Sequence, residues 1–253
     1  MGRQLTDAVK NLLIINVLVF IGMVSVGNNN EPFTTWFALY FPENARFQPW
    51  QVLTHMFMHG DIMHIFFNMF ALWMFGTAVE RIFGWKKFIM FYLLSGFGAA
   101  TLQIAFSYYF YNTGLAELVN AGFSETNIIE LLSTNQYSQN WANVLGDIEN
   151  TERFAGSYIS PMVGASGAIM GILVAFGMLY PDNKLMLIFL PIPIKAKYFI
   201  PGIIVLDLIS GLTGQSFFSP SNTAYMAHVG GALTGFLLMY FWKKNEKDKY
   251  RWN

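Results

Sequence analysis

The chain has 253 residues, of which 54% are hydrophobic and 12% charged. That charged share is about half of what a soluble domain carries, so the composition indicates a protein whose main solvent is lipid. Fifteen basic residues balanced by fifteen acidic ones exclude the basic footprint of nucleic-acid binding. The absence of cysteine excludes disulfides, thiolate metal sites and a cysteine nucleophile.

A helix needs about 20 mostly apolar residues to cross a bilayer, because backbone groups cannot stay unpaired in hydrocarbon. Six stretches approach this length: residues 11–27, 61–80, 88–111, 158–180, 198–212 and 224–242. We therefore expect an all-α membrane protein whose six transmembrane helices lie within residues 11–242. The first stretch lacks a small-residue cleavage site and is interpreted as a retained helix, with a cleaved leader as the alternative.

Positive charge lies mainly on one side of this arrangement, as is typical of cytoplasmic loops. With both termini in the cytoplasm, Arg46 and Arg153 are the only basic residues outside. Residues 1–10 are then a short cytoplasmic N-terminus, and residues 243–253 a basic cytoplasmic tail. Residues 185–194 contain Pro191 and Pro193, which cannot donate to a helix ladder, so we expect an interfacial connector there.

Two long segments lie outside. The large aromatic residues of 28–60 include Trp36, Phe37, Phe41, Phe47 and Trp50. We expect this first segment to be partly submerged at the interface, and a solvated connector is the alternative. Residues 112–157 form a polar extracytoplasmic loop insertion, in which Ser124 before an apolar run predicts a short capped helix.

Polar side chains inside membrane helices are costly, so each one is a candidate for function. At the outer start of the second helix, His64 and Asn68 are four residues apart and share one face, with His59 just before them. Together they offer N–H donors at one place. The alternative is that each is hydrogen-bonded to a neighbouring helix.

Ser166 lies between Gly164 and Gly167 at the start of the fourth helix. Its small neighbours leave the hydroxyl unobstructed, and the free backbone N–H groups of a helix N-terminus favour developing negative charge, which suits an oxyanion. Gly167 and Gly171 also form a small-xxx-small pattern, which is frequent in membrane helices without catalysis. This motif alone is therefore weak.

In the last helix, His228, Gly231 and Gly235 are spaced to share a face. Pairing this glycine seam with that of the fourth helix predicts Ser166 and His228 side by side in the outer half of the membrane. The second helix also enters from outside, which brings its donors to the same depth. A serine hydroxyl needs a base to take its proton, and His228 can serve as that base.

These motifs resemble, in order, those of the rhomboid family of intramembrane serine proteases. The matches are Gly164, Ser166 and Gly167 to GxSG, His59, His64 and Asn68 to His-x4-His-x3-Asn, Ala227, His228, Gly231 and Gly235 to AHxxGxxxG, and Gly76, Glu80 and Gly84 to GxxxExxxG. The resemblance covers residues 11–242 apart from the insertion at 112–157.

The resemblance implies a rhomboid-like bundle in which Ser166 is the nucleophile and His228 the base. It implies that His59, His64 and Asn68 serve oxyanion binding and local hydration. The expected activity is that of a serine endopeptidase that cleaves single-span transmembrane proteins near the outer membrane face. The bacterial inner membrane is the expected location, and no metal or organic cofactor is implied.

Two positions depart from the family pattern. Trp50 is followed by Gln51 where the family often has arginine, and some catalytically silent relatives also lack that arginine. Met170 stands where many members have an aromatic that packs on the catalytic histidine, so we expect a looser sulfur–ring contact with His228. A non-catalytic rhomboid-like binding module is therefore the alternative function. A transporter is disfavoured because no internal repeat or pair of broken helices is evident.

Four further features carry weaker expectations. Asp207 is the only carboxylate deep in an expected span, and we expect it to pair with a neighbouring helix and not to complete a triad. His55, four residues before His59, is expected to anchor the loop and not to bind a metal. Glu80 is expected to determine a helix end and turn. Phe217 and Phe218, in the loop 215–222, are expected to gate the site.

Overall fold

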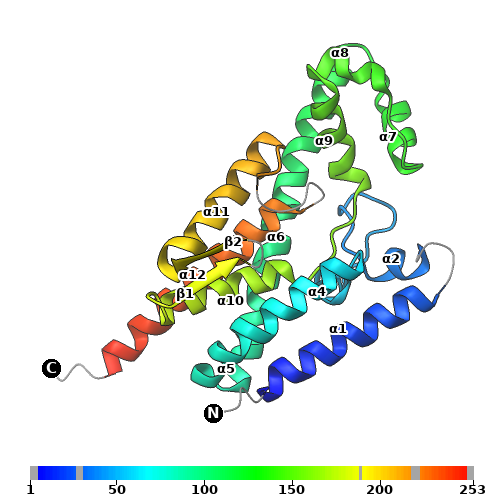
Figure 1. The fold of residues 1–253 in the computed structure, drawn as a ribbon. Helices are drawn as coiled ribbons and strands as arrows, with labels where there is room; N and C mark the ends of the chain where they lie inside the picture. The colour runs from blue at the N-terminus through cyan, green and yellow to red at the C-terminus, as the bar shows by residue number, and fades with distance from the viewer. Residues whose placement is uncertain (1–4, 27–30, 188–189, 218–222, 250–253) are drawn as a thin grey trace.

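The computed structural model describes residues 5–26, 31–187, 190–217 and 223–249. Helices dominate these residues (Figure 1). The bundle contains α1 (Asp7–Ser25), α4 (Ile62–Ala71), α5 (Thr77–Phe83), α6 (Trp85–Asn120), α10 (Ser166–Leu179), α11 (Ala196–Thr213) and α12 (Tyr225–Lys249). A π-helical turn η3 (Leu72–Gly76) joins α4 to α5 without a break.

Four helices of the described residues are long and apolar enough to span a membrane: Asp7–Ser25, Ile62–Phe83, Trp85–Asn120 and Ala196–Thr213. α10 is apolar but has only 14 residues. At about 1.5 Å per residue, a helix of that length falls short of the roughly 30 Å hydrocarbon core. α10 is instead among the most buried elements, packed against α6, α11 and α12.

The structure corrects two expected helix boundaries. The third helix does not end near residue 111, because α6 continues to Asn120. The fourth stretch, residues 158–180, is not one helix: α9 (Ile148–Ile159) ends, residues 160–164 are not helical, and α10 begins at Ser166. Pro161 lacks a backbone donor and Gly164 has a positive φ of 125°, so the helix cannot run through this segment.

The insertion at 112–157 is a folded layer, not an open loop. Beyond the C-terminal end of α6 it forms α7 (Glu125–Ser133), η4 (Gln139–Trp141), α8 (Ala142–Leu145) and α9 (Figure 1). The helix expected after Ser124 is confirmed as α7, although the serine side chain makes no cap hydrogen bond. A second apolar core holds the layer together: Phe41, Tyr111, Leu118, Ile128, Leu132, Trp141, Phe154, Ala155 and Tyr158.

The first outer segment is also structured, as α2 (Glu31–Phe37), α3 (Gln51–Thr54) and η2 (His55–Phe57). Residues 38–41 between them are buried against the protein. Trp36 and Trp50 remain 60% and 44% exposed and stack at 6.0 Å between ring centroids. These exposed rings are free to contact a membrane interface.

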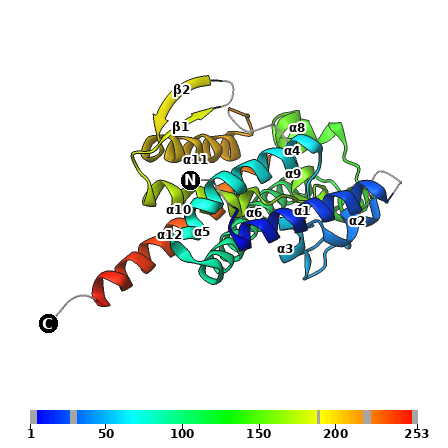
Figure 2. The same ribbon diagram turned by 60° about the horizontal axis from the view of Figure 1, so that its bottom comes forward.

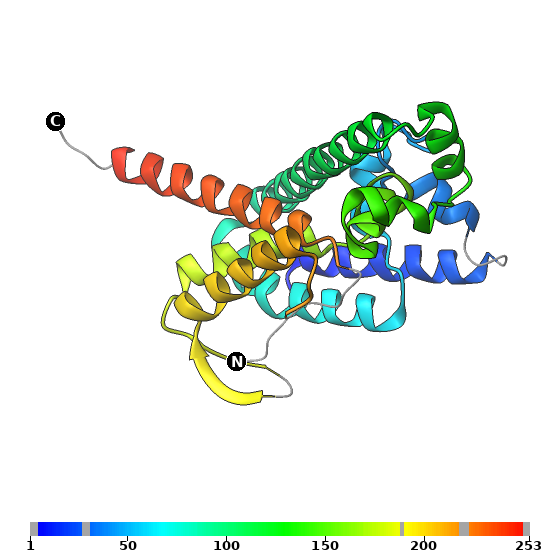
Figure 3. The same ribbon diagram turned by 90° about the horizontal axis from the view of Figure 1, so that it is seen from above.

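At the opposite end of the bundle, the expected connector is an antiparallel hairpin of β1 (Lys184–Leu187) and β2 (Leu190–Lys195). It projects beside the start of α11 (Figure 2). A two-stranded sheet has only edges, where proline is tolerated, which explains Pro193 within β2. α12 extends past the other helices at its C-terminal end (Figure 3).

Candidate active site

The backbones of α10 and α12 are in direct contact along their glycines. A methyl group at Gly235 would lie 2.6 Å from Gly171 Cα, and one at Gly231 would overlap the Gly167 carbonyl. A methyl at Gly167 would lie 3.4 Å from the Ala227 carbonyl oxygen. The residues next to this last contact are Ser166 on α10 and His228 on α12.

Ser166 and His228 are both half-buried, each at the start of its helix. Within the described residues no hydrogen bond joins the serine Oγ to the imidazole. Catalytic hydrogen bonds are often long in ligand-free enzymes and tighten when substrate binds, so the missing bond does not exclude this pair.

The first outer segment holds the residues that lead into Ser166. Leu39 and Met162 form an isolated antiparallel bridge, with N···O distances of 2.9 and 2.8 Å. Two residues further on, Gly164 N–H donates to the His55 carbonyl at 2.9 Å. Gly164 has its positive φ at this point, and a Cβ there would lie 2.8 Å from His64 Nε2. Only glycine therefore fits beside His64.

His64 lies in the first turn of α4, close to Gly164 of the loop before Ser166. Its backbone N–H donates to the Asp61 carboxylate at 2.8 Å, which caps the helix. The point where a Gly164 Cβ would sit is 2.8 Å from His64 Nε2 and 3.6 Å from Ser166 Oγ. The imidazole and the hydroxyl thus border the same small space.

His59 and Asn68 have buried side-chain nitrogens that lack a hydrogen-bond partner among the described residues. The His59 ring is fully buried, both its nitrogens are unpaired, and it meets the His64 ring edge-on at 5.1 Å. Burial lowers the pKa of His59 to about 3, so the ring is neutral. Asn68 is buried and its amide nitrogen is unpaired. These are donors still available to a ligand or water.

Asp207 pairs with a neighbouring helix, as expected, and the partner is His228. His228 Nδ1 and Asp207 Oδ2 are 2.8 Å apart, with the carboxylate side chain 1% exposed and the imidazole 13% exposed. The order of the helices is a signal for this pair: α12 follows α11 and runs back along it, so an acid in the second half of α11 reaches the level of a histidine near the start of α12.

Gln51, at the position where the family often has arginine, is fully buried. Its Oε1 accepts from the backbone N–H groups of Tyr40 at 3.3 Å and Gln48 at 3.1 Å. Its Nε2 donates to the carbonyls of Thr35 and Arg46, both at 2.9 Å. A neutral amide therefore connects four points of the first segment.

His55 anchors the same segment from its other end. Its Nδ1 lies 2.9 Å from the Gln51 carbonyl, and burial lowers the pKa of His55 to about 4, so the neutral ring donates there. No group of three metal-ligating side chains occurs in the part of the chain that the structure describes. Met170 is buried in the core, whereas Phe217 is 54% exposed and Phe218 lies outside the described residues.

Glu80 lies in α5 but caps the N-terminal end of α1. Its buried carboxylate accepts from the Thr6 hydroxyl and from the backbone N–H groups of Ala8 and Val9, both at 2.9 Å. A carboxylate at a helix N-terminus satisfies unpaired donors and complements the helix dipole. Glu80 thereby fixes the start of α1 to α5.

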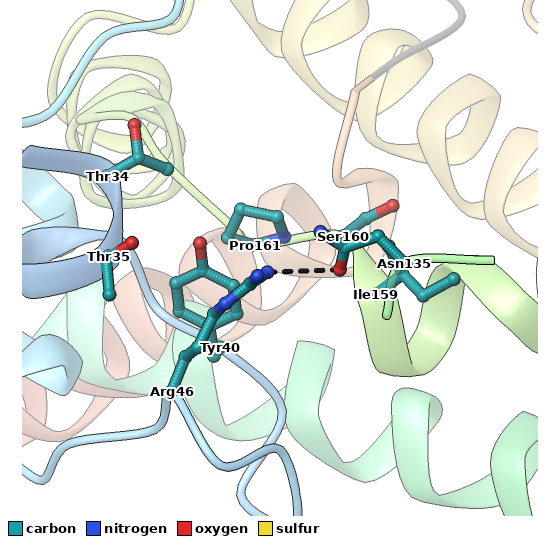
Figure 4. Close-up of a pocket in the computed structure, with 8 residues that line it drawn as sticks. All are labelled: Thr34, Thr35, Tyr40, Arg46, Asn135, Ile159, Ser160 and Pro161. Carbon is teal, nitrogen blue, oxygen red and sulfur yellow. Dashed lines mark hydrogen bonds between the residues drawn. The ribbon is translucent and has the colours of Figure 1, made fainter. Parts of the chain in front are cut away.

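Two cavities open beside the candidate site. The larger, about 430 Å³, lies between the first segment and the end of α9, where Arg46 donates to Asn135 at 3.0 Å across it (Figure 4). The smaller, about 200 Å³, shares Thr34 and Pro161 with it and reaches His59. Ser166 and His228 do not line these two cavities, and His59 lines the smaller one.

The glycine-paired helices, the serine at a helix start and the histidine-rich turn define a rhomboid membrane domain, and the chain belongs to the rhomboid family: the model of the Rhomboid domain matches residues 46–245. The resemblance seen in the motifs is thereby confirmed. Among curated proteins, the chain is 35% identical over 96 residues to the rhomboid protease GlpG of Salmonella choleraesuis (strain SC-B67). It is 34% identical over 96 residues to those of Salmonella newport (strain SL254) and Salmonella typhimurium (strain LT2).

Each of these alignments covers 38% of this chain and 34% of the relative. The chain thus spans about a third of the length of the curated relatives it matches. The likeness is confined to part of each protein, so the activity of the whole chain is a separate question.

Proposed function

We propose that this protein is an intramembrane serine endopeptidase, with Ser166 as nucleophile and His228 as base. The observation that supports the proposal is the backbone contact of α10 with α12 at Gly167 and Ala227, the residues next to Ser166 and His228 in the chain. An unaided serine hydroxyl is a weak nucleophile, and an adjacent imidazole is the usual means of activating it.

The reaction proceeds through two acyl transfers. As Ser166 Oγ bonds to the scissile carbonyl carbon, its proton passes to His228 Nε2. When the carbon–nitrogen bond breaks, that proton moves to the departing amine. Water then attacks the acyl-enzyme, giving its proton to His228, and Ser166 recovers a proton as the acid product leaves.

The oxyanion of each tetrahedral intermediate needs hydrogen-bond donors. The Ser166 backbone N–H at the start of α10, His64 beside Gly164, and the unpaired amide of Asn68 are available for this role. Removing one such donor typically costs about 3 kcal/mol of transition-state stabilisation. His59 is buried and lines the smaller cavity, which supports a role in local hydration.

The substrates that fit this site are single-span transmembrane proteins, cut near the outer membrane face. Ser166 and His228 lie in the first turns of α10 and α12. Both helices begin toward the side of the bundle that carries α7–α9 (Figure 1). We propose six membrane helices within residues 11–242, of which the short α10 is enclosed by longer neighbours, with the short N-terminus 1–10 and the basic tail 243–253 in the cytoplasm. The bacterial inner membrane is the proposed location.

A non-catalytic rhomboid-like binding module is the second candidate. The missing hydrogen bond between Ser166 and His228 and the replacement of the family's arginine by Gln51 favour it. Against it stand the serine, the histidine and the unpaired donors that gather at one place.

Cleavage of a model transmembrane substrate by the purified protein in detergent tests the proposal. We expect Ser166→Ala and His228→Ala each to lower the rate by at least roughly 10³-fold, because nucleophile and base act as a unit. A serine-directed fluorophosphonate should label the wild type and the control Ser160→Ala, but not Ser166→Ala. Cleavage that survives both substitutions contradicts the site, and absence of cleavage and labelling in the wild type favours the binding module.

A further inference from the structure

The contact between Asp207 and His228 joins a third helix to the proposed catalytic pair. The Asp207 side chain is almost completely buried in α11, and its Oδ2 lies 2.8 Å from His228 Nδ1. A buried carboxylate in a membrane span requires a strong hydrogen-bonding partner. Here the partner is the residue proposed as the base, on the ring nitrogen that does not take the serine proton.

We propose that Asp207 is a positioning residue, which fixes the orientation and tautomer of His228. The inference rests on the proposed function of Ser166 and His228. An ionised carboxylate only accepts hydrogen bonds, so the paired Nδ1 carries the hydrogen. The neutral ring then has its lone pair on Nε2, which is the form a base needs. When Nε2 takes the serine proton, the carboxylate stabilises the imidazolium without taking a proton itself.

The outer end of α11 is held in place, so the carboxylate is presented in a fixed position. Gly211 packs against the Met226 side chain at the start of α12, with no room for a methyl group between them. Arg153 of α9 donates to the Leu212 carbonyl at 3.1 Å, at the last turn of α11. A helix held by neighbours on both sides can position a side chain more accurately than a loop.

The competing explanation is that the pair only satisfies a buried acid. The two explanations order the variants oppositely. If the negative charge of the carboxylate that faces the imidazole matters, Asp207→Glu keeps the function better than Asp207→Asn. The reason is that asparagine can donate to Nδ1 and stabilise the wrong tautomer. If only packing matters, the isosteric asparagine is tolerated and the longer glutamate disrupts a site with no spare room.

The experiment measures kcat and KM of the full-length protein in detergent. We expect Asp207→Asn to lower kcat by roughly 10²- to 10⁴-fold with KM nearly unchanged, as expected for a base held in the wrong tautomer. We expect Asp207→Glu to retain activity within about tenfold of the wild type. Ser210→Ala is the matched control, since it removes another buried polar group one turn further along α11 and should change kcat by less than twofold.

Nitrogen NMR of histidine-labelled protein reports the tautomer of His228, which a merely structural role of Asp207 would leave unchanged. The chain has four histidines, so comparison with His228→Ala assigns the resonances of His228. We expect a protonated Nδ1 in the wild type and a redistribution toward protonated Nε2 in Asp207→Asn. Thermal unfolding of each variant establishes that it is folded.

Three outcomes overturn the inference. They are a wild-type kcat in Asp207→Asn, a higher kcat in Asp207→Asn than in Asp207→Glu, and a His228 tautomer that is unchanged in Asp207→Asn. An active wild type with an unaffected Asp207→Asn refutes the inference alone and leaves the serine protease standing. An inactive and unlabelled wild type refutes the proposed function, and the role of Asp207 falls with it.

Discussion

At the scale of the residue, Gln51 shows how a buried amide can organise a loop. Its two accepted and two donated hydrogen bonds connect backbone groups on both sides of the first outer segment. His55 then attaches to the Gln51 carbonyl, and the His55 carbonyl in turn holds Gly164 in front of Ser166. The family's arginine is therefore replaced here by a neutral side chain that is fully engaged.

We expect Gln51→Glu to destabilise the protein by on the order of 3 kcal/mol. The carboxylate cannot donate to the carbonyls of Thr35 and Arg46, and a buried acceptor left unpaired costs about 1–3 kcal/mol. The free energy of unfolding in mixed micelles measures the loss. Gln48→Glu is the control, the same change at a half-buried position of the segment, and should cost no more than about 0.5 kcal/mol. Equal losses in the two variants would contradict the role of Gln51.

At the scale of the element, the contact of α10 with α12 depends on residues that have no side chain. Gly231 faces the Gly167 carbonyl and Gly235 faces Gly171 Cα, so the two backbones touch. The short α10 gains its stability from this burial among longer helices, since it is itself too short to cross the hydrocarbon. The serine at its start is thereby fixed relative to the histidine on α12.

We expect Gly231→Ala to force α10 and α12 apart, because the new methyl group would overlap backbone, which cannot move aside as a flexible side chain can. The free energy of unfolding should fall by about 1–3 kcal/mol. The cleavage rate should fall by a larger factor than the fraction of folded protein. Thermal unfolding and cleavage assays on the same preparation measure both. Gly202→Ala on α11 is the control, because nothing lies within 4 Å of the added methyl. The control substitution should be neutral or stabilising by up to about 1 kcal/mol. A Gly231→Ala protein as stable and active as this control would contradict the close glycine contact of α10 with α12.

At the scale of the whole molecule, the two ends of the bundle differ in kind. One end carries the helical layer α7–α9 with its own apolar core, and the other carries the β1–β2 hairpin (Figure 1). Near the hairpin, Lys195 and Lys197 both bind Asp182, at 3.1 and 2.9 Å. A basic end opposite a larger polar layer is typical of a cytoplasmic side opposite an outer side.

We expect these two ends to lie on opposite sides of the membrane. Because the chain has no cysteine, single cysteines report their own accessibility. In intact cells a membrane-impermeant maleimide should label Ser133→Cys on α7, whereas Met186→Cys on β1 should react only after permeabilisation. Both positions are exposed, so reactivity reports the side of the membrane and not burial. Labelling in the reverse order, or of both cysteines in intact cells, would contradict the proposed orientation.

The sequence by itself determined the family, the apolar character of the bundle and the shared faces of its motifs. Each of these follows from local regularity: helix period, charge placement and residue spacing along one element. The glycines of α10 and α12 were identified on that basis, and so was the short helix α7.

Only the tertiary structure decided the break between α9 and α10, the folded layer at 112–157, the four partners of Gln51 and the pairing of Asp207 with His228. The second core, for example, collects Phe41, Tyr111 and Trp141 from distant segments. Spacing along a chain specifies which side chains share a face, but a hydrogen bond requires a particular depth, rotation and direction of two separate elements. Those quantities are set by packing across the whole fold.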